Sequence, residues 1–141
     1  DTKLLQDWLG PRYSSYSDTP MYKNMPMHIK RSTLYSAGSV IHPAIDLAKK
    51  LMAKEIYLLG ADFSFTMNKS HAATNEIKLQ QSLDTATHWV LNNLGHKVPT
   101  LANLKGYLRE LERYIANNKQ IKFYNGSELG AFIMGTLQWK K

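Results

Sequence analysis

The chain of 141 residues contains no cysteine. Disulfide bonds and thiolate metal sites are therefore excluded, and nothing in the composition indicates a secreted, disulfide-stabilised scaffold. Apolar stretches are short, because none approaches the ~20 residues that a membrane-spanning helix needs. No signal peptide is visible in the sequence, so we expect a cytoplasmic protein without a membrane span.

Several short motifs are also missing. The sequence has neither G-x-G-x-x-G, which is typical of dinucleotide sites, nor the P-loop pattern G-x-x-x-x-G-K-[ST]. It has no H-x-x-x-H or H-E-x-x-H pair either, and such pairs favour zinc. These absences remove the usual support for NAD binding and P-loop chemistry, and we predict no metal site.

Positive charge is in excess, with 18 Lys and Arg against 11 Asp and Glu, a net charge of +7. This balance favours an anionic partner such as a nucleotide phosphate, an acidic sugar or nucleic acid. Aromatic and basic residues alternate in a set that could form a nucleic-acid-binding surface. No nucleic-acid-binding motif accompanies them. They are Trp8, Arg12, Tyr13, Tyr16, Tyr22, Lys23, Lys30, Arg31 and Phe65. We therefore predict no nucleic-acid partner.

Size and composition suit one α/β domain, since 43% of the residues are apolar and 11% aromatic. A doubly wound nucleotide domain needs two βαβ halves, and this sequence has clear signals for only a few strands and two long helices. The chain also begins at Asp1 rather than Met. We expect a single nucleotide-binding domain, or a fragment of one, that belongs to a larger protein.

Residues 35–65 form the stretch around which the rest is organised. A small-residue turn opens a helix that begins near His42, and the helix leads into the apolar run Ile56–Leu59. Such a short, uniformly apolar run is typical of a parallel strand covered on both faces. Three- and four-residue spacing predicts that one helical face lies on the sheet. That face comprises Ile41, Ala44, Ile45, Ala48, Leu51 and Met52.

The second half of the chain repeats this pattern of helix and strand. Asn103–Asn118 is predicted to be an amphipathic helix, and Ile121–Tyr124 a short strand parallel to the first. Before them, Trp89–Leu91 and Lys97–Thr100 read as a β-hairpin. We predict a Rossmann-like three-layer sandwich with a mostly parallel sheet. The remaining expectations are short helices at residues 1–9 and 128–137, a loop at 11–26 and a strand at 28–34.

The turn before the first long helix supplies two nucleotide-binding candidates. Gly38 would let the backbone approach a phosphate, and the Ser39 hydroxyl adds a hydrogen-bond donor. The alternative is a plain helix cap. After the first strand, Gly60 and Asp62 stand at the carboxyl edge of the sheet, where ligands bind in open α/β folds. Asp62 could accept a hydrogen bond from a ribose or only cap its own turn.

Two further groups are candidates at the same edge. His71 lies on a polar loop beyond the strand and could act as a base, with Asp62 beside it, although an exposed histidine without a role is the common case. Asn125 and Ser127 end the second strand and could contact the nucleotide, or form a turn and a helix cap. His42 could point into this cleft or simply cap its helix.

Five segments, in the same order along the chain, resemble sequences of the Maf/MptE-like family. They read G-S-V-x-H-x-A-x-x-L-A, K-E-I-Y-L-L-G-A-D-F-S-F, S-H-A, W-V-L-N-x-x-G-x-K-V-P-T and Y-N-G-S-E-L-G-A-F-I-x-G-T. The resemblance covers roughly residues 35–136, takes nothing from 1–34, and extends to bacterial sialyltransferases through the alanine-rich helix and the K-E-I-Y-L-x-G-x-D-F strand. It moves Gly38, Ser39 and Asp62 toward the site, and Asn125 and Ser127 more weakly.

The resemblance implies a transferase. The first alternative is a bacterial glycosyltransferase that transfers a CMP-activated nonulosonic or sialic-acid-like sugar to a protein such as flagellin. This reaction implies no certain cofactor. The second alternative is a pyrophosphokinase of the MptE-like type, which would need ATP and Mg²⁺. A nucleotide-binding or interaction module without catalysis is the third. The donor sugar, the acceptor and the oligomeric state stay open.

Overall fold

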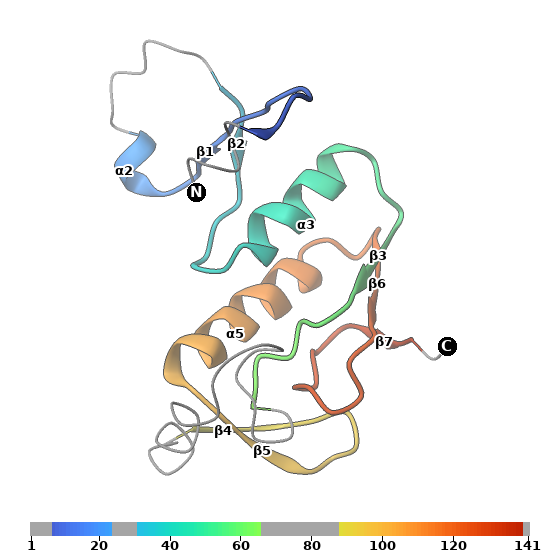
Figure 1. Ribbon diagram of the computed structural model, residues 1–141. Coiled ribbons are helices and arrows are strands. Elements are labelled where there is room, and N and C mark those ends of the chain that lie inside the picture. The colour runs from blue at the N-terminus through green and yellow to red at the C-terminus, as the bar shows by residue number, and fades with distance from the viewer. Residues whose placement is uncertain (1–6, 24–30, 66–87, 140–141) are drawn as a thin grey trace.

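The protein is a mixed α/β chain with two long helices and small, mostly parallel sheets (Figure 1). The computed structural model describes residues 7–23, 31–65 and 88–139. The long helices are α3 (Ile41–Lys50) and α5 (Ala102–Ala116). The first begins where the sequence predicts, and the second lies within two residues of the predicted Asn103–Asn118.

The central sheet has three strands in the order β3-β6-β7. Its members are β3 (Glu55–Leu58), β6 (Lys122–Asn125) and β7 (Leu137–Gln138), and both pairings are parallel. The predicted parallel pairing of the two apolar strands is thus confirmed, with Ile56 opposite Phe123. Because parallel strands end at a common edge, the loops after β3 and β6 are brought together.

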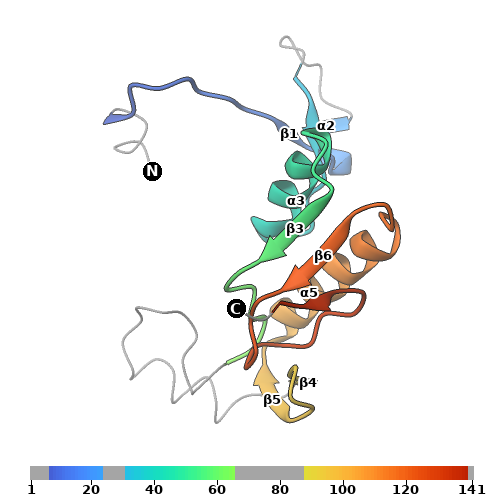
Figure 2. The same cartoon turned by 90° about the vertical axis from the view of Figure 1, so that its right-hand side faces the viewer.

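The hydrophobic core lies between this sheet and the two helices, which cover one of its faces (Figures 1 and 2). The helical periodicity of α5 directs Leu108, Leu111 and Ile115 inward, and all three are buried. On the sheet, Phe123 is 2% exposed, and Ile56 and Leu58 are buried beside it. Burial of each such side chain contributes about 1.5–3 kcal/mol.

The opposite face of the sheet is bare in the described residues. Tyr57 is 46% exposed, and its ring stacks on that of Tyr124 with centroids 4.6 Å apart. Trp139 meets Tyr57 edge-on at 5.8 Å. The described residues therefore cover this strand on one face, and its predicted cover on the second face stays a prediction. The run looks uniformly apolar in sequence, yet tyrosine tolerates water, so burial alternates along β3.

The apolar face of helix α3 contains fewer residues than predicted. Leu51 and Met52 follow the helix and are each 73% exposed, and Met52 has a φ of 66°. Ala44 is also exposed. The buried residues of the helix are His42 and Ile45. The turn at Leu51–Met52 ends the helix early because the chain must reverse to enter β3.

The predicted hairpin is confirmed as β4 (His88–Leu91) and β5 (Lys97–Thr100), which pair antiparallel. The predicted helix at 128–137 is wrong. That segment is a loop with a bridge from Ala131 to Asn92, and it ends in β7. Gly135 has a φ of +86°, and the amide of Phe132 donates to the carbonyl of Leu91 at 2.7 Å. These backbone bonds to another segment replace helical ones.

The N-terminal part contains a small parallel pair, β1 (Tyr16–Ser17) with β2 (Thr33–Leu34), and the short helix α2 (Pro20–Lys23). The first strand and this helix fall within the predicted loop 11–26. Residues 1–6 and 28–30 lie outside the described residues, so the helix and the strand predicted there stay predictions. Residues 8 and 9 are not helical and Leu9 is 99% exposed, so the helix predicted at 1–9 does not reach its predicted end. Of the strand predicted at 28–34, residues 33 and 34 form β2, and residues 31 and 32 are outside it. Among the described helices, none is long and apolar enough to cross a membrane.

Tyrosine hydroxyls join the segment after β2 to both long helices. The Tyr35 amide donates to Asp46 Oδ2 at 3.1 Å, and the Tyr114 hydroxyl donates to Asp46 Oδ1 at 2.9 Å. The Tyr35 hydroxyl donates to Glu110 Oε2 at 2.9 Å. Burial, with this bond to Glu110, raises the pKa of Tyr35 to about 12, so the hydroxyl keeps its proton at a pH where an exposed tyrosine ionises.

Candidate functional site at the carboxyl edge of the sheet

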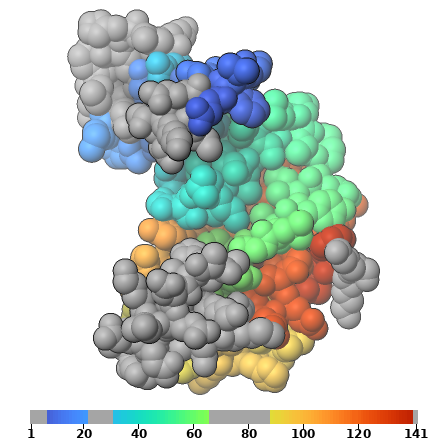
Figure 3. Space-filling view, viewed as in Figure 1, coloured from blue at the N-terminus to red at the C-terminus, as the bar shows by residue number. Residues whose placement is uncertain are grey.

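Asp62 and Ser127 are brought together at the carboxyl edge. The Ser127 hydroxyl donates a hydrogen bond to Asp62 Oδ1 and accepts one from the amide of Gly130 at 3.1 Å. The amide of Ala131 donates to the Asp62 carbonyl at 2.7 Å. The loop after β6 is therefore tied to the chain that follows β3, and residues 51–65 (green) lie against the C-terminal segment (red) in Figure 3.

Asn125 lies beneath this loop and is fully buried. Its side-chain oxygen accepts from the Ser127 amide at 3.0 Å, and its side-chain nitrogen donates to the Ala131 carbonyl at 3.3 Å. Since its exposed fraction is 0%, the structure places this side chain as a brace of residues 126–131. A ligand above the loop would depend on it without touching it.

Gly60 forms the turn between β3 and Asp62. Its φ is +71°, a conformation that glycine adopts without the strain of a side chain. No atom lies within 4 Å of where its Cβ would stand. This position therefore sets the direction of the chain, and open space remains above it.

The Gly38–Ser39 turn contacts α5. Gly38 has a φ of +92°, and a Cβ there would overlap the Tyr107 ring. The Ser39 amide points at His42 Nδ1, 3.3 Å away. The N-cap of α3 is Val40, which makes no side-chain cap bond. The contacts of this turn are thus with the helices, whereas those of Asp62 are with the loop after β6.

His42 is buried with 0% exposure between the two helices. Its Nε2 lies 3.1 Å from the Tyr107 carbonyl, and its ring meets that of Tyr35 edge-on. The structure therefore gives His42 a role in packing α3 on α5. His71 lies outside the described residues, so its proposed meeting with Asp62 stays a prediction.

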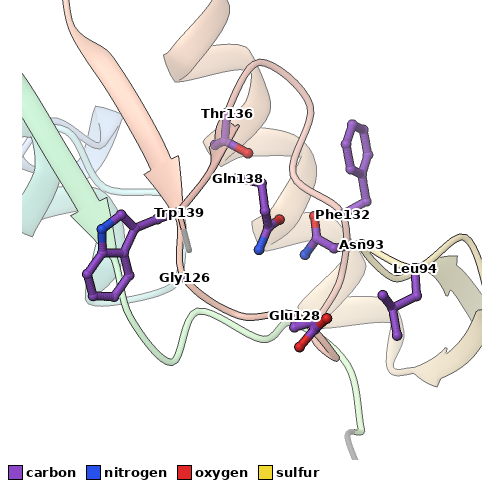
Figure 4. A pocket seen from close by; sticks show the side chains of 8 residues that line it. All are labelled: Asn93, Leu94, Gly126, Glu128, Phe132, Thr136, Gln138 and Trp139. Carbon is purple, nitrogen blue, oxygen red and sulfur yellow. The ribbon is translucent and has the colours of Figure 1, made fainter. Parts of the chain in front are cut away.

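A pocket of about 730 Å³ opens beside the loop after β6 (Figure 4). Its walls come from the hairpin tip, this loop and the end of β7. The lining residues are Asn93, Leu94, Gly126, Glu128, Phe132, Thr136, Gln138 and Trp139. The sequence interpretation missed most of them, because the hairpin tip read as a turn and residues 128–137 as a helix. The one signal was the position of residues 126–128 directly after a parallel strand.

The pocket combines amides with aromatic rings. Figure 4 shows the side chains of Asn93 and Gln138 reaching into the same space from different elements, with Trp139 and Phe132 on opposite sides. None of the eight lining residues in the described chain is basic, and one, Glu128, is acidic. Such walls suit a planar ring, which can stack on an aromatic side chain and hydrogen-bond to an amide.

No metal centre stands out in the part of the chain that the structure describes. No three His, Cys, Asp or Glu side chains there are grouped so that they could hold an ion.

Comparison with known protein families gives one match. Residues 1–68 match the family described as 6-hydroxymethylpterin diphosphokinase MptE-like. Over these residues, the chain is similar to the MptE-like family. No curated protein and no solved structure matches the chain.

The MptE-like match confirms the resemblance predicted from the sequence motifs, but its extent differs. It includes residues 1–34, which contributed nothing to the predicted resemblance, and it ends at residue 68. Gly38, Ser39, Gly60 and Asp62 lie inside it. Asn125, Ser127 and all the pocket-lining residues lie beyond it.

Proposed function

We propose that this chain is the nucleotide-binding part of a transferase and that the carboxyl-edge pocket holds the base and sugar of the nucleotide. The observation that carries the proposal is the position of the pocket, at the end of β6 in a parallel sheet, where ligands bind in open α/β folds. Its volume of about 730 Å³ also lies within the range of small-molecule sites, about 300–1,000 Å³. The MptE-like match supports a transferase, since the family name is that of a diphosphokinase.

The first candidate reaction is glycosyl transfer from a CMP-activated, sialic-acid-like sugar to a protein such as flagellin. It is supported by the Maf-like motifs over residues 35–136 and by the net charge of +7, which suits an acidic donor. An acceptor hydroxyl would attack the anomeric carbon, a base would take its proton, and CMP would leave. We assign the base to His71 and a supporting role to Asp62, whose Oδ1 is already held by Ser127.

The second candidate reaction is ATP-dependent pyrophosphoryl transfer. It is favoured by the family name over residues 1–68. This chemistry would need Mg²⁺ to offset the phosphate charge. In both reactions, we assign the phosphates to the backbone near Gly38, Ser39 and Gly60. If nucleotide binds without turnover by the whole protein, the non-catalytic binding module is the remaining assignment.

The bare face of the sheet bears on the fold. Parallel sheets are ordinarily covered on both faces. We propose that a further layer covers Tyr57 and Tyr124 and completes a Rossmann-like sandwich.

A thermal-shift panel of CMP, CDP, UDP, GDP and ATP with Mg²⁺ tests the nucleotide assignment, because a ligand that binds the native state raises the melting temperature. We expect CMP to give the largest rise under the glycosyltransferase assignment, and ATP with Mg²⁺ under the kinase assignment. Failure of all five to raise it would contradict nucleotide binding by this chain.

Gln138→Ala should weaken binding of the responding nucleotide about 2- to 10-fold, because one neutral hydrogen bond is worth about 0.5–1.5 kcal/mol. Gln120→Ala is the matched control, since Gln120 is exposed in the turn before β6, at the other end of the strand. Titration calorimetry on both variants gives the comparison. Equal affinities for the two variants would place the nucleotide outside this pocket.

A further inference from the structure

We infer that the pocket selects rings that carry an amino group and that Glu128 and Asn93 determine this specificity. The inference rests on the proposed function and adds the chemical feature by which the pocket would choose among nucleotides. It follows from the hydrogen-bonding groups that line the pocket, because acceptors outnumber donors at the end formed by Glu128 and Asn93.

The Asn93 side chain has already used its donor nitrogen. Its Nδ2 donates to the Ser127 carbonyl at 2.6 Å and lies 3.5 Å from the Gly130 carbonyl. An asparagine amide has two N–H donors on one atom and one oxygen acceptor. With the nitrogen turned toward the loop, the group that Asn93 can offer a ligand is its oxygen.

Glu128 adds acceptors at the same pocket. Its side chain is exposed and lines the end of the pocket near the hairpin tip (Figure 4). An ionised carboxylate can only accept hydrogen bonds. Together with the Asn93 oxygen, it makes this end rich in acceptors. Gln138, across the pocket, can both donate and accept and therefore discriminates less.

An acceptor-rich wall complements an amino group and opposes a ring carbonyl at the same position. A ring oxygen there would face other oxygens and would lose its hydrogen bonds to water, and polar mismatches of this kind carry most of the discrimination in binding sites. The Glu128 charge also repels phosphate, so the phosphates should point away from this end. The Trp139 ring could stack on any base, so stacking would add affinity without base specificity.

The test compares pairs of nucleotides that differ only in this group, CMP with UMP and AMP with IMP. Wild-type protein should bind the amino member of each pair about tenfold more tightly by titration calorimetry. Glu128→Gln, which can donate as well as accept, should reduce that preference to about twofold. Glu55→Gln removes the same charge at the amino end of β3 and should keep the wild-type preference.

Equal binding of both members by wild-type protein would overturn the inference and leave the proposed function standing. A loss of preference in Glu55→Gln as large as in Glu128→Gln would also overturn it, because overall charge would then be the cause. If none of the four nucleotides binds, the nucleotide assignment falls and this inference falls with it. The preserved preference in Glu55→Gln together with its loss in Glu128→Gln supports the inference.

Discussion

Replacing Asn125 with alanine should lower the free energy of unfolding by about 2–4 kcal/mol, because a buried group without its partner costs about 1–3 kcal/mol. The substitution removes the partner of the buried Ala131 carbonyl and that of the half-buried Ser127 amide. It also opens a small cavity under the loop. Nucleotide binding at the pocket should be lost with the ordered loop. Urea denaturation and titration calorimetry measure the two effects.

The control for this substitution is Asn117→Ala, since Asn117 is exposed at the end of α5. It should change stability by no more than about 0.5 kcal/mol. An Asn125→Ala protein that is as stable as this control, yet has lost nucleotide binding, would contradict the claim that Asn125 stabilises residues 126–131. It would return Asn125 to the direct nucleotide contact predicted from the sequence.

Gly38→Ala should cost about 2–3 kcal/mol of stability. The φ of +92° strains any residue with a Cβ, which costs about 1–3 kcal/mol, and the added methyl group would overlap the Tyr107 ring. The expected result is a lower denaturation midpoint, measured by circular dichroism in urea. The same substitution at Gly60 meets no neighbouring atom and should cost only the backbone strain.

A double-mutant cycle separates packing from phosphate binding at Gly38. If the Tyr107 ring is the obstacle, Gly38→Ala combined with Tyr107→Ala should be destabilised by less than the sum of the two single changes. The phosphate assignment adds a second expected effect, since Gly38→Ala should then lower nucleotide affinity as well as stability. A stable Gly38→Ala protein would contradict the packing role that the structure gives this glycine, and unchanged nucleotide affinity would contradict the phosphate assignment at this turn.

The helices and strands were predictable because their patterns are local. The helix α5, predicted as amphipathic, keeps a 3.6-residue apolar period over about four turns, and this period buries Leu108 and Leu111. The parallel pairing of β3 with β6 follows from helix-linked apolar runs. That topology, in turn, made the meeting of residues after β3 and β6 predictable.

The pocket was not predictable because its walls depend on contacts between distant segments. Residues 128–137 have helix-compatible spacing, yet the amides of Ala131 and Phe132 pair with Asp62 and Leu91. Tertiary pairing thus overrode local preference. The role of Gly38 was hidden for the same reason, since the Tyr107 ring that fills its space lies on another helix. The short run of amides at the hairpin tip carried no distinguishing sequence signal.

The most direct test of nucleotide binding at the carboxyl edge is a titration of ¹⁵N-labelled protein with CMP, or with ATP and Mg²⁺, followed by NMR. The chain has three tryptophans, and only Trp139 lines the pocket. The account predicts saturable shifts of the Trp139 indole N–H and the Gly126 amide, while the indole signals of Trp8 and Trp89 stay in place. Shifts confined to the Gly38 amide and its neighbours, with Trp139 unchanged, would contradict it.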